Sequence, residues 1–456
     1  MTPRLGAWSA GALVVANMIG SGAFTVSGFA LAALGEPGPV LLAWAIGGAI
    51  ATCGALSYGA LGRRLPISGG EYALLSRAVH PLAGFLAGWL SLLAGFTAPI
   101  ALAALGLQAY FDATLGRPAG APWLGALAIV LCALAHAGRA SLGVRLQNAA
   151  VALKLAGIAA FVAIGAVHAG PGAERVLRMP ESVDVVALAG TVVWVSFAYS
   201  GWNAALYVAG ELRDPARSLT RSLVGATALV TLAYLSLNAV FLLAAPVAAL
   251  SGRAEIGAVA AEALGGAPLR QALSALVGFA LLTSISSLLM AGPRVYAQMA
   301  DDGLLPRFLR SRAAAPRAAI ALQALLALGL SAASDFAELL GYAGFLLSLS
   351  SAATVLALMR LRAREDARRV PLPGWPWLPA AFVAATSASA LALVWREPFV
   401  LALGAATLAP ALPVYYLMTR TRARGRGRLR TAQPVPDRDA LGRADEGRLR
   451  VRGRSR

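Results

Sequence analysis

Two long apolar stretches of this chain each contain a cluster of glycine and small polar residues near their middle. The first reads Met18-Ile19-Gly20-Ser21-Gly22-Ala23-Phe24, and the second reads Phe197-Ala198-Tyr199-Ser200-Gly201-Trp202-Asn203. Glycine is a poor helix former, and broken backbone at membrane depth persists only where it lines a cavity. Paired breaks at corresponding positions in the two halves of a chain indicate the binding site of a transporter.

A broken helix exposes backbone groups that can bind charge. The half-helix ending near Ile19 leaves carbonyl oxygens unpaired, and the half-helix beginning near Ser21 leaves amides unpaired at the positive end of its dipole. The amides of Ser21, Gly22 and Ala23 are therefore expected to bind a carboxylate. The carbonyls near Ile19, together with those of Phe197, Ala198 and Ser200, suit an ammonium group. One gap of this kind fits an α-amino-acid zwitterion without any charged side chain.

These residues also have structural interpretations. Glycines such as Gly20 and Gly201 let membrane helices approach closely, which is the commoner role of any single glycine. Trp202 is more often a packing aromatic than a substrate contact, and Phe197 suits either the core or a gate. The polar side chain of Asn203 would find no hydrogen-bond partner in lipid, so we expect it to face a cavity.

Lys154 is the single lysine among 39 basic residues, and it lies near the middle of an apolar stretch. A cation at the bilayer centre costs about 2.5–3.5 kcal/mol even on insertion scales, so it usually faces a cavity and has a function. The alternative is that Lys154 lies nearer one end and extends to the interface. With apolar residues dominating both flanks, we favour a functional role.

The composition is that of a membrane protein with many spans. Of 456 residues, 58% are apolar and 13% are charged, and the mean hydropathy is +0.69. A hydrocarbon core of roughly 30 Å needs about 20 apolar residues per helix. Such stretches predict twelve spans: 8–33, 38–62, 81–108, 122–138, 144–167, 185–210, 222–248, 269–298, 317–334, 336–358, 374–395 and 397–419.

The arginines predict the orientation, because basic residues stay on the cytoplasmic side. Placing the N-terminus inside puts 32 of the 38 arginines in cytoplasmic loops or termini and 6 outside. Both termini are therefore expected in the cytoplasm. The net charge of +18 lies in these loops and in residues 420–456, which read as a disordered tail that could attract anionic lipid. This distribution argues against a nucleic-acid partner.

No pattern indicates a metal site, a cofactor or enzymatic catalysis. Cys53 and Cys132 lie inside predicted spans and read as packing residues. His80, His136 and His168 lie near span ends without metal-ligand spacing.

Four motifs, in order along the chain, resemble the amino acid–polyamine–organocation (APC) permeases. They are Asn17 to Phe24, Pro66-Ile67-Ser68-Gly69-Gly70-Glu71-Tyr72, Phe197 to Asn203 with Glu211 to Arg217 after it, and Gly292-Pro293-Arg294-Val295-Tyr296 through Pro306. The chain looks most similar to the L-type amino acid transporters and their bacterial relatives.

The resemblance implies an all-α membrane fold with a five-plus-five inverted repeat, as in the sodium-coupled leucine transporter, with helices 1 and 6 discontinuous. A transmembrane domain would cover 1–419, with repeat one at 8–167, repeat two at 185–358 and two appended helices at 374–419.

The resemblance also implies roles for single residues. Ile19, Ser21 and Gly22 would contact the substrate carboxylate, and carbonyls around Phe197 and Ser200 would bind its amine, with Asn203 as a polar contact. The predicted substrate site also includes Gly20, Ala198 and Gly201. Phe197 and Trp202 are the candidate gate residues. Lys154 is the candidate coupling residue: it would occupy the place of a structural sodium ion and bridge to the first helix, which implies sodium-independent transport, and it is either a proton carrier or a permanent strut.

We therefore expect a secondary carrier of amino acids in the cytoplasmic membrane, coupled to protons or working by exchange. A polyamine antiporter is one alternative, but such substrates usually need acidic side chains, and the predicted spans contain no acid near their middle. A non-transporting amino-acid sensor is another. The 109–121 loop has no cysteine, so no disulfide-linked heavy chain is expected.

Overall fold

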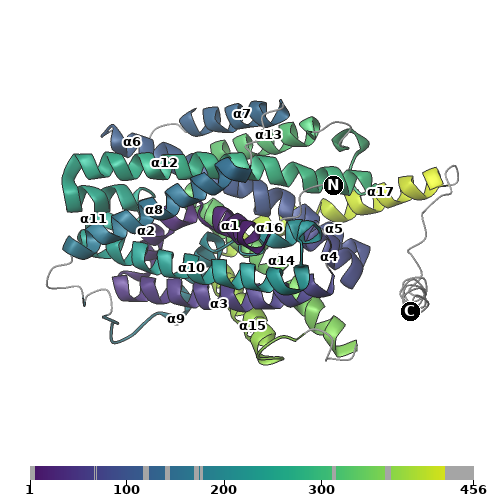
Figure 1. Cartoon of the computed structure of the whole chain (residues 1–456), viewed down its shortest axis with the longest axis horizontal. Helices are drawn as coiled ribbons and strands as arrows, with labels where there is room; N and C mark the ends of the chain where they lie inside the picture. The colour runs from purple at the N-terminus through teal and green to yellow at the C-terminus, as the bar shows by residue number, and fades with distance from the viewer. Residues whose placement is uncertain are drawn as a thin grey trace, which may run out of the picture.

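In a computed structural model of the chain, the fold is built almost wholly of helices (Figure 1). The structure describes residues 6–65, 67, 69–116, 123–138, 144–168, 174, 178–310, 315–364 and 371–426. Most of the predicted tail lies outside these residues, although its first part, as far as Arg426, continues the last helix.

The first half of the chain contributes helices to both sides of the central pocket. Their bounds are α1 (Ala7–Met18), α2 (Gly22–Leu34), α3 (Pro37–Arg64), α4 (Gly70–Ala78), α5 (Pro81–Leu90), the π-helical segment η1 (Ser91–Thr97), α6 (Ala98–Thr114), α7 (Trp123–Ala137) and α8 (Val144–His168).

The second half begins with another broken element and ends with the helices α15, α16 and α17 after α14. Its bounds are α9 (Val185–Ala198), the 3-10 helix η3 (Ala204–Glu211), α10 (Pro215–Ala244), α11 (Val247–Leu250), α12 (Ile256–Asp301), η4 (Arg307–Leu309), α13 (Arg317–Ala333), α14 (Phe336–Arg364), α15 (Trp377–Arg396), α16 (Pro398–Leu408) and α17 (Ala411–Arg426).

Eight helices of the described residues are long and apolar enough to cross a membrane, and the bent pair α1–α2 makes a ninth. Three shorter apolar helices, α7, α9 and α13, fall below that length. The expectation of an all-helical membrane protein is confirmed at this level. Lipid-facing side chains agree with it: Leu134 and Leu391, for example, are 65% and 70% exposed.

Several boundaries differ from those expected. The sixth span, expected as 185–210, is α-helical only to Ala198. The eighth, expected as 269–298, belongs to a longer element that begins at Ile256 and has non-helical backbone at Gly265 and Gly266. The helix is kinked at this glycine pair, and Gly266 has a φ of 65° that glycine adopts without strain.

The π-helical segment η1 interrupts the third span immediately before a proline. Pro99 has no N–H and its ring crowds the preceding turn, so the hydrogen-bond ladder is displaced upstream of it. The hydroxyl of Thr97 donates to the carbonyl of Leu92 at 2.6 Å. Segments of this kind are often found at functional sites, and η1 contributes to the pocket described below.

The helices α4, α5 and α17 gather toward one end of the molecule, and α11 lies at the opposite end (Figure 1). At the α11 end, Gly252 N donates to Gly28 O at 2.8 Å. A Cβ on Gly28 would come within 1.9 Å of the Arg253 carbonyl oxygen. The α11–α12 segment therefore packs directly on α2 and covers it.

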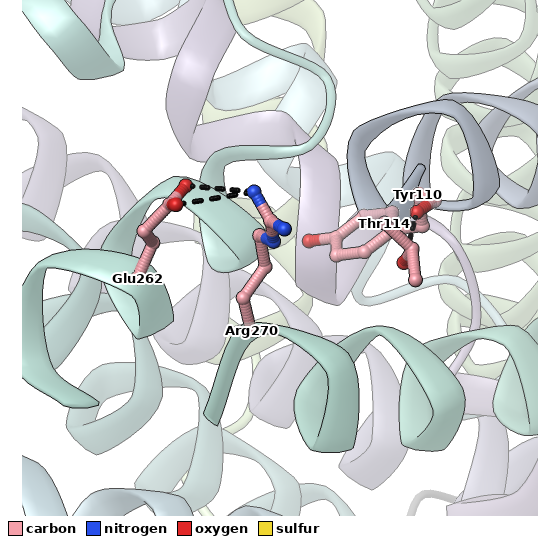
Figure 2. A network of polar contacts seen from close by, with 4 residues as sticks. All are labelled: Tyr110, Thr114, Glu262 and Arg270. Carbon is pink, nitrogen blue, oxygen red and sulfur yellow. Dashed lines mark hydrogen bonds and ion pairs between the residues drawn. The ribbon is translucent and has the colours of Figure 1, made fainter. Parts of the chain in front are cut away.

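An ion pair spans the Gly265–Gly266 break in the same region. Arg270 contacts the Glu262 carboxylate at 3.1 Å, and its guanidinium lies between Glu262 and the Tyr110 ring in Figure 2. Tyr110 belongs to α6, and its hydroxyl donates to Phe24 O at 2.7 Å and accepts from Gly257 N at 3.1 Å. One phenol thus joins α6, α2 and α12.

Candidate substrate pocket

The first break lies between α1 and α2. Helix α1 ends at Met18, α2 begins at Gly22, and the two axes differ by 41°. The expected interruption at Gly20 is confirmed. The amides of Ser21, Gly22 and Ala23 stand at the start of α2, where a helix has no internal acceptors for them, and no described side chain accepts from them.

The second break follows α9. The α-helix ends at Ala198, Gly201 has a φ of 103°, and the chain resumes as the 3-10 helix η3. A positive φ of this size is accessible to glycine and strained for other residues. Gly201 therefore allows the turn that separates α9 from η3.

The two breaks contact one another. A Cβ on Gly22 would lie 2.6 Å from the Cα of Ala198, and a Cβ on Gly201 would lie 2.7 Å from the backbone of Asn17. Real Cβ atoms are not found at such distances, so each break requires a glycine where the other crosses it. The close approach brings the backbone ends of α1, α2 and α9 to one place.

A pocket opens at this crossing. Its walls come from both breaks and from α3, η1, α12, α14 and α15. The lining residues include Asn17, Gly20, Ser21, Gly22, Ser91, Phe96, Phe197, Ala198, Ser200, Gly201, Trp202, Asn203, Tyr207, Ser284, Ser287, Ser348, Ser351, Phe382 and Thr386. Aromatic and other apolar side chains line much of the pocket, and hydroxyls, backbone groups and the Glu71 carboxyl supply its polar surface.

Nine of the eleven residues predicted for the site line this pocket, namely Gly20, Ser21, Gly22, Phe197, Ala198, Ser200, Gly201, Trp202 and Asn203. Ile19 and Lys154 do not. The Ile19 side chain is fully buried in the core. The individual substrate roles of all these residues stay predictions.

Lys154 is held beneath the pocket. Its side chain is 3% exposed, and its Nζ donates to Ile19 O at 3.2 Å. The Ser284 hydroxyl lies 3.5 Å from the same oxygen. The Ile19 carbonyl expected to receive a substrate ammonium therefore already has a side-chain donor. The resemblance implied a bridge from Lys154 to the first helix, but residue spacing alone could not indicate that Ile19 is the partner, because the two residues are 135 apart along the chain.

Tyr234 of α10 connects the two breaks. Its hydroxyl lies 2.5 Å from Met18 O and 3.3 Å from Ala198 O, the last helical carbonyls of α1 and α9. The Tyr234 side chain is fully buried. Met18 O also accepts from Gly20 N at 2.8 Å, so the phenol adds a second donor there and supplies a side-chain donor at Ala198 O.

The two candidate gate residues are packed aromatics. Phe197 is 5% exposed and Trp202 is 8% exposed. The Trp202 ring packs edge-on against two aromatic rings. Its centroid lies 4.6 Å from that of Tyr58 and 6.1 Å from that of Phe382. Both rings also border the pocket, which is compatible with either packing or gating.

The sequence analysis missed one chemically important residue, Glu71. It lies between predicted spans, yet the short helix α4 returns it to the pocket, where it is 5% exposed. Its carboxylate accepts from Tyr58 at 2.5 Å, Ser350 at 2.7 Å and Asn203 at 3.3 Å. Burial raises the pKa of the Glu71 carboxyl, and these three hydrogen bonds partly oppose that change. The motif Gly69-Gly70-Glu71-Tyr72 was the available signal.

Across the described residues, no group of three His, Cys, Asp or Glu side chains could hold a metal ion. Cys53 and Cys132 are both free thiols.

The family comparison agrees with this geometry. The family model described as "Amino acid permease" matches residues 5–418. The chain belongs to the amino acid permease family. It is thus an APC-superfamily permease, as the four motifs indicated, and permeases of this family are transporters and not enzymes.

Curated relatives of this permease are distant but cover most of its length. The "Large neutral amino acids transporter small subunit 2" of Rattus norvegicus is 28% identical over 433 residues, which is 91% of this chain and 80% of the relative. The "Asc-type amino acid transporter 1" of Mus musculus is 27% identical over 435 residues, 91% and 81% of the two chains. The "b(0,+)-type amino acid transporter 1" of Mus musculus is 28% identical over 378 residues, 79% and 77%.

Proposed function

We propose that this permease is a secondary active transporter that moves amino acids across the cytoplasmic membrane by alternating access, without sodium, coupled to protons or by exchange. The observation that carries the proposal is the pocket at the crossing of the two breaks. Free amides at the start of α2 supply a carboxylate site, and Ser200 and Asn203 add polar groups to the lining beside the ring of Phe197. The name of one relative, "Large neutral amino acids transporter small subunit 2", favours neutral amino acids as substrates.

The proposed topology has twelve spans. The nine apolar spans and the three shorter apolar helices account for them, with both termini cytoplasmic as the arginine distribution indicates. Helices α1 to α8 would form one repeat and α9 to α14 its inverted counterpart. Spans one, two, six and seven would rock against the others, hinging at the two breaks.

Lys154 supports the absence of sodium. Its ammonium lies 3.2 Å from the carbonyl that ends α1, where a bound cation would otherwise neutralise the helix end. A second cation beside it would be repelled. We therefore propose that Lys154 replaces sodium and holds the first break in place.

A polyamine antiporter is the nearest alternative, because Glu71 lines the pocket. Both of its carboxylate oxygens already accept hydrogen bonds, which disfavours a further contact with a substrate amine. A non-transporting sensor would use the same pocket but would give no flux. The 109–121 loop contains no cysteine, so the transporter is proposed to work without a disulfide-linked heavy chain.

The test begins with a thermal-shift screen of the twenty amino acids and of putrescine on the purified protein. A ligand that binds only the folded state raises the melting temperature by mass action. Counterflow of the stabilising amino acid in proteoliposomes, in sodium and in choline medium, then measures transport. Equal rates in both media are expected. A requirement for sodium, or binding without any flux, would contradict the proposal.

A further inference from the structure

We infer that Glu71 is a proton-carrying residue of this transporter, located where the moving helices meet the scaffold at the α4 end of the pocket. The inference deepens the proposed function and rests on it, because it assigns the coupled proton to a particular side chain.

The first argument is the position of the carboxyl group. Glu71 starts α4, yet it is 5% exposed and borders the pocket. Its three donors come from three different elements: Tyr58 from α3, Asn203 at the start of η3, and Ser350 from α14. In the proposed rocking motion, α3 and η3 move while α4 and α14 stay. Movement at this boundary must therefore break some of the hydrogen bonds to Glu71.

The second argument is the absence of a compensating cation. No described lysine, arginine or histidine forms an ion pair or hydrogen bond with Glu71. The titratable groups that face it are the phenols of Tyr58 on α3 and Tyr207 on η3, while α14 presents the hydroxyl of Ser350, which donates to Glu71. A buried carboxylate with neutral neighbours is costly, and the cost is avoided by binding a proton.

The direction of coupling follows from burial. In the closed arrangement, burial raises the pKa of Glu71, so this state binds a proton more tightly than an open one. When the α4 end opens, water reaches the carboxyl and its pKa falls toward the ordinary value, so the proton is released on that side. Protonation therefore favours the closed end, and deprotonation favours opening.

The helix arrangement indicates on which side of the membrane the proton is released. Helix α4 lies at the same end as α17 (Figure 1), and the proposed topology places that end in the cytoplasm. Before opening, the carboxyl is reached through the pocket, by the same route as the substrate. Substrate and proton would then enter together, one proton per carboxyl group.

The test compares wild type, Glu71→Gln and the control Asp112→Asn in proteoliposomes loaded with a pH-sensitive dye. Asp112 is also a buried carboxyl, 7% exposed and hydrogen-bonded by Gln108, but it does not border the pocket. A pH gradient of about two units can drive up to about hundredfold accumulation at one proton per substrate, since each pH unit equals one tenfold concentration ratio. Wild type and Asp112→Asn should show driven accumulation with proton uptake. In Glu71→Gln, amino acid accumulation driven by the pH gradient should fall at least tenfold relative to the variant's rate of amino acid exchange.

Infrared spectroscopy gives a second readout that does not depend on transport. Wild type and Asp112→Asn should show a protonated-carboxyl stretching band that titrates above the range of an ordinary glutamate, and the band should be absent from Glu71→Gln. Three results would show that the assignment of Glu71 is wrong: amino acid exchange in wild type without proton flux, accumulation driven by the pH gradient in Glu71→Gln, or a wild type without the infrared band. The transporter proposal would stand in each case. Absence of any amino acid exchange in wild type contradicts both.

Discussion

One side-chain donor reaches the backbone of the first break. Lys154 Nζ donates to Ile19 O, so this carbonyl already has a hydrogen-bond partner, and in the proposed role that partner is an ammonium. Hydrogen bonds to charged groups contribute about 1.5–3 kcal/mol, which is enough to hold a short unwound segment in one conformation.

Lys154→Gln tests this role. The amide side chain is shorter and neutral, so the contact with Ile19 weakens and the end of α1 loses its orientation. We expect substrate affinity to fall about tenfold to hundredfold, in line with the energy of the lost bond, measured by titration calorimetry. An unchanged pH dependence of the variant's transport would argue against proton carriage by Lys154. Wild-type affinity in the folded variant would contradict the holding role.

Gly22→Ala tests the crossing of the breaks. The added methyl would lie 2.6 Å from the Cα of Ala198, so the two segments must separate. Overpacking of this kind costs about 1–3 kcal/mol, and we expect a lower melting temperature together with loss of binding. The matched control is Gly11→Ala in α1, where the nearest atom lies at 4.0 Å. The crossing is not critical if both variants behave alike.

At the scale of the elements, the α11–α12 segment acts as a cover on α2. Tyr110 links the two, because its hydroxyl donates a hydrogen bond to Phe24 O of α2 and accepts one from Gly257 N of α12. We call this pair of hydrogen bonds the joint. The ion pair between Glu262 and Arg270 adds little to stability by itself, because Glu262 is half-exposed and exposed pairs are worth about 0–1 kcal/mol.

Tyr110→Phe removes both hydrogen bonds of this joint. A buried amide or carbonyl without a partner costs about 1–3 kcal/mol, so the melting temperature should fall. Amide hydrogen exchange, followed by mass spectrometry, should accelerate in residues 250–260 first. Tyr416→Phe is the control, because that ring is 55% exposed. Uniform acceleration throughout the protein would contradict a local joint.

Sequence reasoning worked best for the broken elements and worst for residues that reach the pocket from elsewhere. Glycine clusters within apolar runs predicted both breaks, because an unpaired backbone in a membrane needs a cavity. Glu71 lies in a polar segment between two spans and is brought to the pocket only by the return of α4. Likewise Phe382 and Thr386 face the pocket from α15, and no local pattern distinguishes them from packing residues.

For the whole molecule, the orientation in the membrane can be tested directly. In a variant without Cys53 and Cys132, cysteines are introduced singly at Glu181 and at Arg307, both exposed in the structure. The proposed topology places Glu181 outside and Arg307 in the cytoplasm. A membrane-impermeant maleimide added to intact cells should label only the Glu181→Cys variant, and Arg307→Cys should be labelled after the cells are opened. The reverse pattern would invert the proposed orientation.

The position of Tyr234 has a consequence for how the two halves of the molecule communicate. A phenol has one hydroxyl hydrogen, so it can donate fully to Met18 O or to Ala198 O but not to both at once. Met18 O also accepts from Gly20 N at 2.8 Å, so when Tyr234 donates to Met18 O it is Ala198 O that is left for water or substrate. Tyr234 would then decide whether the end of α9 is available, so the hydration of the second break would depend on the position of the first.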